Sequence, residues 1–560
     1  MKVVVIGGTG VFGARLVRLL LRDGHDVTVA GRDGVAAAAF AAEVGAGALG
    51  LDRAGDLAPL WALGPDVVVD AAGPFHAYGA DPYRLPREAI AAGVSYLDLA
   101  DDADFCAGIA GLDAAAKDAG VFALSGVSSV PAISSAAVAM LAEGADEIDV
   151  IDTAILPGNR APRGRSVVES ILHQCGAPLA YPLDGAEVTG RGWSDPASYD
   201  LGQGLRRKGW MIRVPDQALF ADAFGARTVI FRAGLELPLM NRALAVVSWF
   251  RSKAAFRWRN WMVGGLVRLA DLLKPFGSDV GGMSVSVTGR WGASWERRTW
   301  RLIAEAGEGP FIPAVAARAV LRRPGAIAPG ARPAVAVVPM LEIAAAMADL
   351  AVKTEVVAED SKPIFPAVLG DAFDSLPPEV QTAHRTHGPR LWQGRGSVTR
   401  GASRWARFVA WLFRFPQATD DIAVSVTMTP KNGGELWERR FGDATFRSFL
   451  RPENGRMTER FGPLTFTLGL HVAEGRLHYP VVLGRCGPIP LPRFLLPQSV
   501  ASEYAADGRF HFDVALLAPF TGAPMVHYRG WLTRASGFGD RDKKGIQGPE
   551  VTASVKDRVL

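Results

Sequence analysis

The chain has 560 residues, which is too many for one hydrophobic core and predicts about three domains. Hydrophobic residues make up 49% of it and charged residues 21%, an ordinary globular composition that argues against disorder outside the C-terminal end. The net charge is only +4, which gives no support for nucleic acid as a partner.

The three cysteines, Cys106, Cys175 and Cys486, lie too far apart to indicate a disulfide framework or a metal motif. The histidines are scattered without an HxxxH pattern, so we expect no metal. Neither a signal peptide nor an apolar run of the roughly 18 residues that span a bilayer is visible. These features predict a protein of the reducing cytoplasm.

The chain opens on a β-branched run, Lys2–Ile6, which predicts a parallel strand that is covered on both faces. The heptapeptide GGTGVFG follows, and Gly8, Gly10 and Gly13 have the GxGxxG spacing. In dinucleotide-binding folds these glycines permit a tight turn, close approach of the pyrophosphate and close packing of helix on strand. The residues that we expect to border a dinucleotide are Gly7, Gly8, Thr9, Gly10, Val11, Phe12 and Gly13.

A predicted helix over residues 14–22 and a second strand over residues 26–30 follow the glycines. The N-terminus of such a helix offers unpaired amide groups and the positive end of its dipole to phosphates. A GxGxxG pattern alone is weak evidence. The strand before it and the helix after it favour a dinucleotide site over an empty glycine-rich turn.

The end of the second strand indicates which dinucleotide binds. An acidic residue about 20 positions beyond the glycines would bind the ribose 2′-hydroxyl of NAD, but Gly31 and Arg32 stand at this point. Gly31 leaves room for a 2′-phosphate, and the guanidinium of Arg32 can pair with it. Asp33 is a contrary signal, one residue further on. The sequence favours NADP(H).

Two later strand ends are expected to complete the pocket. Residues 48–51 lead to Asp52, which we expect near the adenine. Residues 66–70 lead to a turn of small residues, in which the backbone can contact the nicotinamide half. A plain turn is the alternative interpretation. The expected contacts on this turn are Ala72, Gly73 and Pro74.

The order of four motifs, GGTGVFG, AGR, DAAGPFHAYG and GVSYLDLADD, resembles the saccharopine dehydrogenase-like oxidoreductases. The resemblance implies that the last two motifs flank the nicotinamide and the substrate. Tyr78 and Asp102 are the candidate catalytic residues, for proton transfer or substrate orientation, and Tyr96 and Asp98 would support them.

The resemblance continues through residues 122–131, except that Ser128 stands where many members carry aspartate. This departure argues against amino-acid-type substrate chemistry. Residues 305–313 resemble the point at which the second domain of the family returns a helix, here residues 314–321, to the first domain. The resemblance therefore covers about residues 1–352, and it says little about the substrate.

Between these points the pattern predicts an α+β domain. Residues 146–156 alternate like a strand, residues 166–175 are predicted to be a helix, and strands at 285–289 and 299–304 are expected to pair with the first. Such a domain suits substrate binding and dimerisation, so a homodimer is one partner that the sequence allows.

Two basic segments of this domain each have two interpretations. Arg160, Arg163 and Arg165 either face an anionic substrate or form a solvated loop. Residues 258–273 place tryptophan, leucine and arginine at helical spacing. This helix either lies on a membrane surface or packs on the core with its arginines reaching solvent.

The composition changes after residue 352. Residues 353–363 are charged and predict a linker. Short strands with Gly/Pro turns follow, roughly eight in number, which is typical of a curved antiparallel sheet or partial barrel. The clearest of them flank Lys-Asn-Gly-Gly at residues 431–434, which predicts a β-hairpin.

Residues 404–414 form a second candidate Arg/Trp helix. Residues 364–376, the hairpin and the turn at 489–492 resemble a bacterial family of a domain of unknown function, number 4166. A half-barrel of this kind either encloses an apolar ligand or serves as a rigid accessory domain. The histidines expected to be structural rather than ligands are His471, His478, His511 and His527.

The sequence thus predicts an α/β Rossmann domain (1–130) with an inserted α+β second domain (131–352), and a C-terminal, mainly antiparallel β domain (364–535). The predicted function is an NADP(H)-dependent oxidoreductase that moves hydride to or from an unidentified, lipid-like small molecule. The alternative is a membrane-surface lipid-binding or regulatory protein that uses the Rossmann domain as a nucleotide sensor. Both are expected in the cytoplasm, peripheral at the inner face of the membrane.

Overall fold

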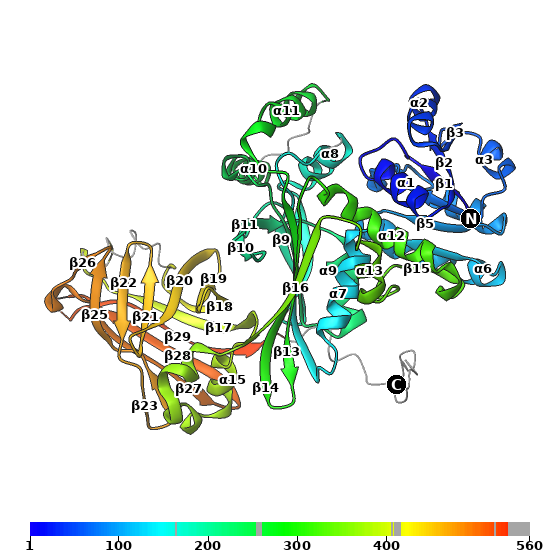
Figure 1. The fold of residues 1–560 in the computed structure, drawn as a ribbon. Helices are drawn as coiled ribbons and strands as arrows, with labels where there is room; N and C mark the ends of the chain where they lie inside the picture. Colours follow the sequence, from blue (N-terminus) through cyan, green and yellow to red (C-terminus); the bar gives the residue numbers. More distant parts are fainter. Residues whose placement is uncertain (163–164, 254–259, 405–406, 408–415, 520–521, 536–560) are drawn as a thin grey trace.

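The computed structural model describes residues 1–162, 165–253, 260–404, 407, 416–519 and 522–535. Three large β-sheets follow one another along the chain and along the length of the molecule (Figure 1). The predicted helix at 404–414 and the charged C-terminal end fall almost entirely outside the described residues. None of the described helices is long and apolar enough to cross a membrane.

The first sheet is parallel and has the strand order β15-β6-β5-β4-β1-β2-β3. Its central strands are buried on both faces, as their β-branched residues predict. Together with its helices it forms the expected Rossmann domain. The strands are β1 (Lys2–Ile6), β2 (Asp26–Gly31), β3 (Gly47–Gly50), β4 (Val67–Asp70), β5 (Ser95–Asp98), β6 (Phe122–Ser125) and β15 (Gly330–Pro333).

Helices lie on both faces of this sheet (Figure 1). The predicted return of a helix from the second domain is confirmed, because α12 packs against α1. Arg318 of α12 fixes this contact by donating two hydrogen bonds of 2.8 Å to the carboxylate of Asp23. The helices are α1 (Gly13–Arg22), α2 (Gly34–Val44), α3 (Ala58–Ala62), α4 (Arg84–Ala91), α5 (Ala103–Gly108), α6 (Asp113–Asp118), α12 (Ile312–Arg322) and α13 (Met340–Ala346).

The middle sheet is mixed and has the order β10-β11-β12-β7-β13-β14-β16. The predicted pairing with β7 is confirmed for β13, whereas β14 was expected to pair with β7 as well and instead pairs with β13 and β16. Helices α7 (Ser134–Leu141) and α9 (Pro215–Phe224) lie between this sheet and the first (Figure 1). The strands are β7 (Glu147–Leu156), β10 (Ala197–Asp200), β11 (Arg206–Met211), β12 (Thr228–Ala233), β13 (Gly281–Trp291), β14 (Ser294–Ala304) and β16 (Val352–Asp360).

Three helices lie at the end of the middle domain shown uppermost in Figure 1, and a hairpin that reaches the third domain completes it. They are α8 (Arg165–Gln174), α10 (Pro238–Arg251), α11 (Asn260–Leu272) and the two-stranded sheet of β8 (Pro178–Leu183) with β9 (Ala186–Arg191).

The prediction of a linker over residues 353–363 is wrong. Residues Val352–Asp360 form β16, which pairs with β14 along its whole length at the edge of the middle sheet. Most of its side chains are exposed. An edge strand tolerates charged residues, so its composition looks like that of a loop.

The first two sheets share one hydrophobic core. A single cluster of buried residues contains Val5 of β1, Leu16 of α1, Val315 of α12 and Val285 of β13. The first and middle domains therefore form one packed unit, and the third domain has a core of its own.

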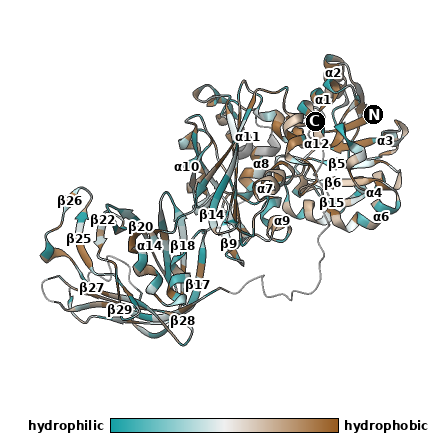
Figure 2. Cartoon of the chain, turned by 60° about the horizontal axis from the view of Figure 1, so that its bottom comes forward, coloured by the Kyte–Doolittle hydropathy of each residue, from teal (hydrophilic) through white to brown (hydrophobic). Residues whose placement is uncertain are grey.

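The third sheet has 13 strands in the order β23-β24-β27-β28-β29-β17-β18-β19-β20-β21-β22-β25-β26, and all its pairs are antiparallel. Several strands carry both hydrophilic and hydrophobic stretches (Figure 2). The strands are β17 (Arg390–Arg400), β18 (Thr419–Lys431), β19 (Gly434–Phe441), β20 (Ala444–Glu453), β21 (Arg456–Phe461), β22 (Leu464–Leu468), β23 (His471–Ala473), β24 (Arg476–His478), β25 (Val481–Cys486), β26 (Ile489–Pro490), β27 (Gln498–Ala506), β28 (Arg509–Leu517) and β29 (Pro524–Arg534). Helices α14 (Ile364–Leu369) and α15 (Pro378–His384) pack against it.

The expected hairpin is confirmed by the pairing of Lys431 with Gly434. The estimate of roughly eight strands was too low. Strand β17 was missed because glycines interrupt its apolar pattern. A Cβ atom on Gly394 would lie 1.9 Å from the carbonyl oxygen of Trp531, so the close approach of β29 requires a glycine there.

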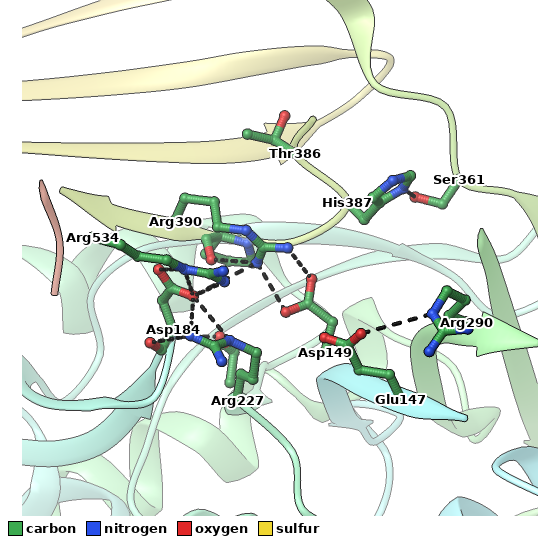
Figure 3. Close-up of polar contacts among 12 residues, drawn as sticks. Glu147, Asp149, Asp184, Arg227, Arg290, Ser361, Thr386, His387, Arg390 and Arg534 are labelled. Carbon is green, nitrogen blue, oxygen red and sulfur yellow. Dashed lines mark hydrogen bonds and ion pairs between the residues drawn. The ribbon is translucent and has the colours of Figure 1, made fainter. Parts of the chain in front are cut away.

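Buried charges join the third domain to the middle domain (Figure 3). Arg390 of β17 donates hydrogen bonds of 2.9 and 2.8 Å to the carboxylate of Asp149 on β7. Asp184, in the turn of the β8–β9 hairpin, accepts from Arg227 at 3.2 Å and from Arg534 of β29 at 3.0 Å. Both aspartate side chains are fully buried, so these ion pairs fix the position of the third sheet.

Candidate functional site

A cleft of about 1320 Å³ lies between the carboxyl ends of the first sheet and one face of the middle sheet. The glycine loop after β1 and the turns after β2 and β4 form one wall. Strands β7, β12, β13 and β14 supply the other wall, with α8 beside them. In parallel α/β sheets this edge is where ligands bind.

The glycine loop is shaped by close backbone contacts. A Cβ atom on Gly7 would lie 2.6 Å from Cα of Ala72, and one on Gly13 would lie 2.2 Å from the carbonyl oxygen of Gly7. Helix α1 begins after Phe12, whose side chain has no polar group to cap it. The amide of Ala14 already donates to the carbonyl oxygen of Gly10 at 2.9 Å, so what α1 offers a dinucleotide pyrophosphate is chiefly the positive end of its dipole.

Most of the predicted loop residues face the cleft. Those that line it are Gly7, Thr9, Gly10, Val11 and Phe12. Gly8 and Gly13 lie behind the surface, where they permit the tight turn and the packing of α1.

The structure explains the contrary signal at Asp33. Its carboxylate accepts a hydrogen bond of 2.9 Å from the amide of Ala36 and caps the N-terminus of α2. Arg32 lines the cleft and is exposed, and no carboxylate pairs with it among the described residues. A Cβ atom on Gly31 would have one neighbour within 4 Å, the hydroxyl oxygen of Thr9 at 3.8 Å. The end of β2 therefore presents open space and a free guanidinium.

Asp52 does not line the cleft. It is exposed, and its carboxylate accepts from the amide of Ala54 at 3.0 Å. Arg53, which the sequence analysis did not single out, lines the cleft instead. Its guanidinium is already paired with Asp70 at 2.8 Å, so it is not available to a phosphate in the way that Arg32 is.

The turn after β4 lies in the cleft as expected, since Ala72, Gly73 and Pro74 line it. Tyr78 lies outside the lining. Its hydroxyl donates to Asp70 at 3.1 Å, and the Arg53 guanidinium stacks on its ring at 3.5 Å. Burial, and then the Asp70 carboxylate, raise the pKa of Tyr78 well above its ordinary value. Its catalytic role stays a prediction.

Tyr96 and Asp98 are fully buried on β5, below the floor of the cleft. Asp98 accepts hydrogen bonds from the amides of Ala100 and Gly126 and from the hydroxyl of Ser125. Burial nevertheless raises the pKa of Asp98 to about 7. Both residues support the strand ends and do not line the cleft.

Asp102 lies in a smaller polar side pocket of about 120 Å³, which shares Asp101, Ser170 and Gln174 with the main cleft. One Asp102 oxygen caps α5 by accepting from the amide of Phe105 at 2.9 Å. Its catalytic role also stays a prediction.

The sequence analysis missed three residues of the side pocket. His76 follows the turn after β4, and its ring stacks on that of His173 from α8 with 5.0 Å between ring centroids. Arg213 bridges the same two walls with hydrogen bonds of 2.9 and 2.6 Å to Asp104. His76 stands in the motif DAAGPFHAYG, so the sequence could have identified it as a candidate. No local pattern around His173 indicates a functional role.

The wall opposite the glycine loop is largely apolar. Few polar side chains interrupt it, and Ser128 and Ser129 line the cleft where the two domains join. The apolar residues of this wall are Ile155, Ile171, Trp193, Ile212, Val214, Phe231, Leu235, Met283 and Leu302.

The predicted arginine loop contributes little to the cleft. Arg160 is exposed and does not line it. Arg163 lies outside the described residues, and nothing is described of the Arg165 side chain. The histidines of the third sheet make structural contacts: His471 stacks on His478, and His527 pairs with Asp513 at 2.6 Å.

Two family models match parts of the chain. The model of the NAD dependent epimerase/dehydratase family matches residues 3–97. That of a domain of unknown function, DUF4166, matches residues 376–532 and confirms the resemblance seen in the sequence of the C-terminal domain. No curated protein matches the chain.

Solved structures resemble parts of this chain. Saccharopine dehydrogenase (L-Glu forming) from Saccharomyces cerevisiae is 16% identical over 64% of this chain and 99% of its own, with a TM-score of 0.47. The WlbA dehydrogenase from Bordetella pertussis, in complex with NADH and UDP-GlcNAcA, is 11% identical over 53% of this chain and 77% of its own, with a TM-score of 0.27.

The N-terminal family match and the glycine cradle point to the same class. The first domain has the strand order and the glycine cradle of a nucleotide-binding Rossmann domain.

Proposed function

We propose that this protein is an NADP(H)-dependent oxidoreductase that transfers hydride to or from a C=C, C=O or C=N bond of an apolar, lipid-like molecule. One observation carries the proposal: a dinucleotide cradle opens into a cleft whose opposite wall is apolar. The nicotinamide supplies the hydride chemistry when bound, and the chain binds, orients and shields the reactants.

The preference for NADP(H) is supported by Arg32. Its guanidinium borders the cleft, and Asp33 is occupied as the cap of α2. The cap uses only Oδ1 of Asp33, which also borders the cleft, so the preference rests on the guanidinium of Arg32. An unpaired guanidinium beside open space suits a 2′-phosphate.

The class of substrate follows from the second wall. Trp193, Phe231 and Met283 line the cleft on the side of the middle domain. Apolar side chains outnumber the polar ones on this wall, to which Glu169, Gln174 and Asp279 also belong, so an apolar substrate would match most of its surface. The serine at Ser128, in place of an acidic residue, agrees with this reading.

We place the group that donates or accepts the proton during hydride transfer in the side pocket. Asp102 and His76 both lie there, and the pocket meets the main cleft at Asp101. An imidazole can both donate and accept a proton, which suits a proton donor at this position. Tyr78 is a weaker candidate because its hydroxyl is held by Asp70.

A binding experiment tests the cofactor. NADPH and NADH are titrated against the protein by fluorescence, and we expect tighter binding of NADPH. Arg32→Ser should weaken NADPH by about 10- to 100-fold, because charge-assisted hydrogen bonds are lost, and should leave NADH nearly unchanged. Arg87→Ser, an exposed arginine paired with Asp81 away from the cleft, is the matched control. Tighter binding of NADH by the unaltered protein would refute the preference.

A nucleotide sensor remains the second candidate. One observation favours it: in the described part of the chain, no lysine, tyrosine or histidine lines the main cleft. Consumption of NADPH is therefore measured with apolar ketones, enoyl compounds and imines. Turnover of any of them supports the enzyme, whereas binding of NADPH without turnover supports the sensor.

We further propose a cytoplasmic protein that is peripheral to the inner face of the membrane, which is where an apolar substrate would be found.

A further inference from the structure

Helices α10 and α11 turn apolar side chains outward. On α10 the exposed fractions are 73% for Leu239, 51% for Trp249 and 60% for Phe250. On and after α11 they are 70% for Leu272 and 72% for Phe276. Large apolar residues at such exposure are unusual when they are grouped on neighbouring elements.

The exposed residues of α10 form a stripe at helical spacing. Leu239, Val246 and Trp249 follow one another at intervals of seven and three residues, so they share one side of the helix. The opposite side is anchored, because Met240 and Leu244 pack against a buried cluster around Trp193. The outer stripe is therefore not needed to hold the helix on the domain.

The same surface carries unpaired positive charge. Arg242, Lys253 and Arg268 are exposed, and no carboxylate pairs with them among the described residues. The segment 238–276 contains a single acidic residue, Asp271, and it pairs with Lys274 at 2.7 Å. Apolar side chains flanked by unpaired cations match the surface of a bilayer that contains anionic lipids.

This surface adjoins the cleft. Helix α11 packs against α8, and α8 contributes Ile171 and Gln174 to the cleft wall. Leu235, three residues before α10, also lines the cleft. Figure 1 shows α8, α10 and α11 together at one end of the middle domain.

We propose that this surface, the outward sides of α10 and α11, docks on an anionic lipid bilayer. Its aromatic and aliphatic side chains enter the interface between headgroups and acyl chains, and its cations face the lipid phosphates. Docking would place the mouth of the cleft at the bilayer, so that an apolar substrate enters without crossing water. That last step rests on the proposed function, whereas docking itself does not.

Flotation of the full chain with vesicles tests the proposal. Vesicles of phosphatidylcholine with phosphatidylglycerol are expected to bind the protein at low salt. Pure phosphatidylcholine vesicles should bind less, and high salt should weaken binding, because the cations act through screened charge. Absence of binding at low salt would overturn the proposal.

Two variants assign the binding to this surface. Trp249→Gln/Phe250→Gln should lower the vesicle-bound to free ratio by about tenfold or more, since two large apolar side chains no longer enter the interface. Leu341→Gln on α13, where the residue is 81% exposed, is the matched apolar control and should bind like the unaltered protein. If the double variant binds as well as the control, the proposal is wrong.

A second pair of double variants tests the contribution of the positive charges to vesicle binding. Arg242→Gln/Lys253→Gln should remove most of the preference for phosphatidylglycerol. Arg451→Gln/Arg456→Gln, two exposed arginines of the third sheet, should not. Equal losses in both pairs would show that only net charge matters and would overturn the assignment.

A second group of exposed apolar residues gives a rival site at the end of the third sheet, around Ile489 and Phe494. If Ile489→Gln/Phe494→Gln abolishes flotation and the α10 variant does not, the third domain carries the membrane contact. NADPH binding is measured on the same samples. If the protein does not bind NADPH but still floats with the vesicles, the proposed function is wrong and the proposed docking surface is retained.

Discussion

Removal of Arg390 should weaken the coupling between the third domain and the rest of the protein, so that the third domain unfolds at a lower urea concentration. Arg390 holds Asp149, whose side chain is fully buried, with two hydrogen bonds of 2.9 and 2.8 Å. The substitution Arg390→Met keeps most of the side-chain volume and leaves the Asp149 carboxylate buried without its partner. Breaking one side of a buried ion pair destabilises a protein by about 3–5 kcal/mol. Equilibrium denaturation in urea should therefore show an earlier transition in the fluorescence of the third domain.

Strand β17 offers a matched control. Arg395 stands on the same strand and pairs with Asp421, but both side chains are more than half exposed. Arg395→Met should have little effect, since water screens such a pair. In Arg390→Met/Asp149→Leu no buried charge is left alone, and most of the lost stability should return. The reasoning is refuted if Arg390→Met is no more destabilising than Arg395→Met, or if the double variant is no more stable than Arg390→Met.

Three further changes test the cradle, the floor of the cleft and the third sheet. Gly13→Ala would bring Cβ to 2.2 Å from the carbonyl oxygen of Gly7, so NADPH binding should fall at least about tenfold in a fluorescence titration; undiminished binding would contradict the cradle. The pKa of Asp98 is raised by burial from 3.8 to about 7, so the folded protein holds a proton that the unfolded chain releases, and its contribution to stability is lost as the pH rises through this window. Asp98→Asn should flatten that decline in thermal unfolding measured across the window, and an unchanged slope would count against the assignment. Gly433 has a φ of 72° in the hairpin turn, so Gly433→Val should destabilise the protein by about 1–2 kcal/mol in urea denaturation, whereas no loss would mean that the turn rearranges freely.

The elements that the sequence predicted best are governed by neighbours along the chain. Strand β1, the glycine loop and α1 follow one another within residues 2–22, and their pattern alone gave the nucleotide site. The hairpin at 431–434 was predictable for the same reason, because Asn432 and Gly433 accept the positive φ values that its turn requires.

The site was predictable only in part. The glycine loop and the turn after β4 lie where the motifs indicated, and Arg32 faces the cleft. Tyr78 and Asp102 were chosen because they stand in the two motifs that the family resemblance places beside the nicotinamide and the substrate. The sequence could not show that Asp70 already holds the Tyr78 hydroxyl, or that one oxygen of Asp102 caps a helix.

By itself the sequence determined that this chain begins with a dinucleotide-binding Rossmann domain and ends in an antiparallel sheet. The physical reason is that strand periodicity, turn conformation and helix capping depend on residues a few positions apart. Only the tertiary structure decided which distant residues meet. It brought His76 against His173 in the side pocket, turned a charged segment into the edge strand β16, and buried Asp149 under Arg390, 241 residues further along the chain. Contacts of that kind depend on how whole domains pack, and no local pattern encodes them.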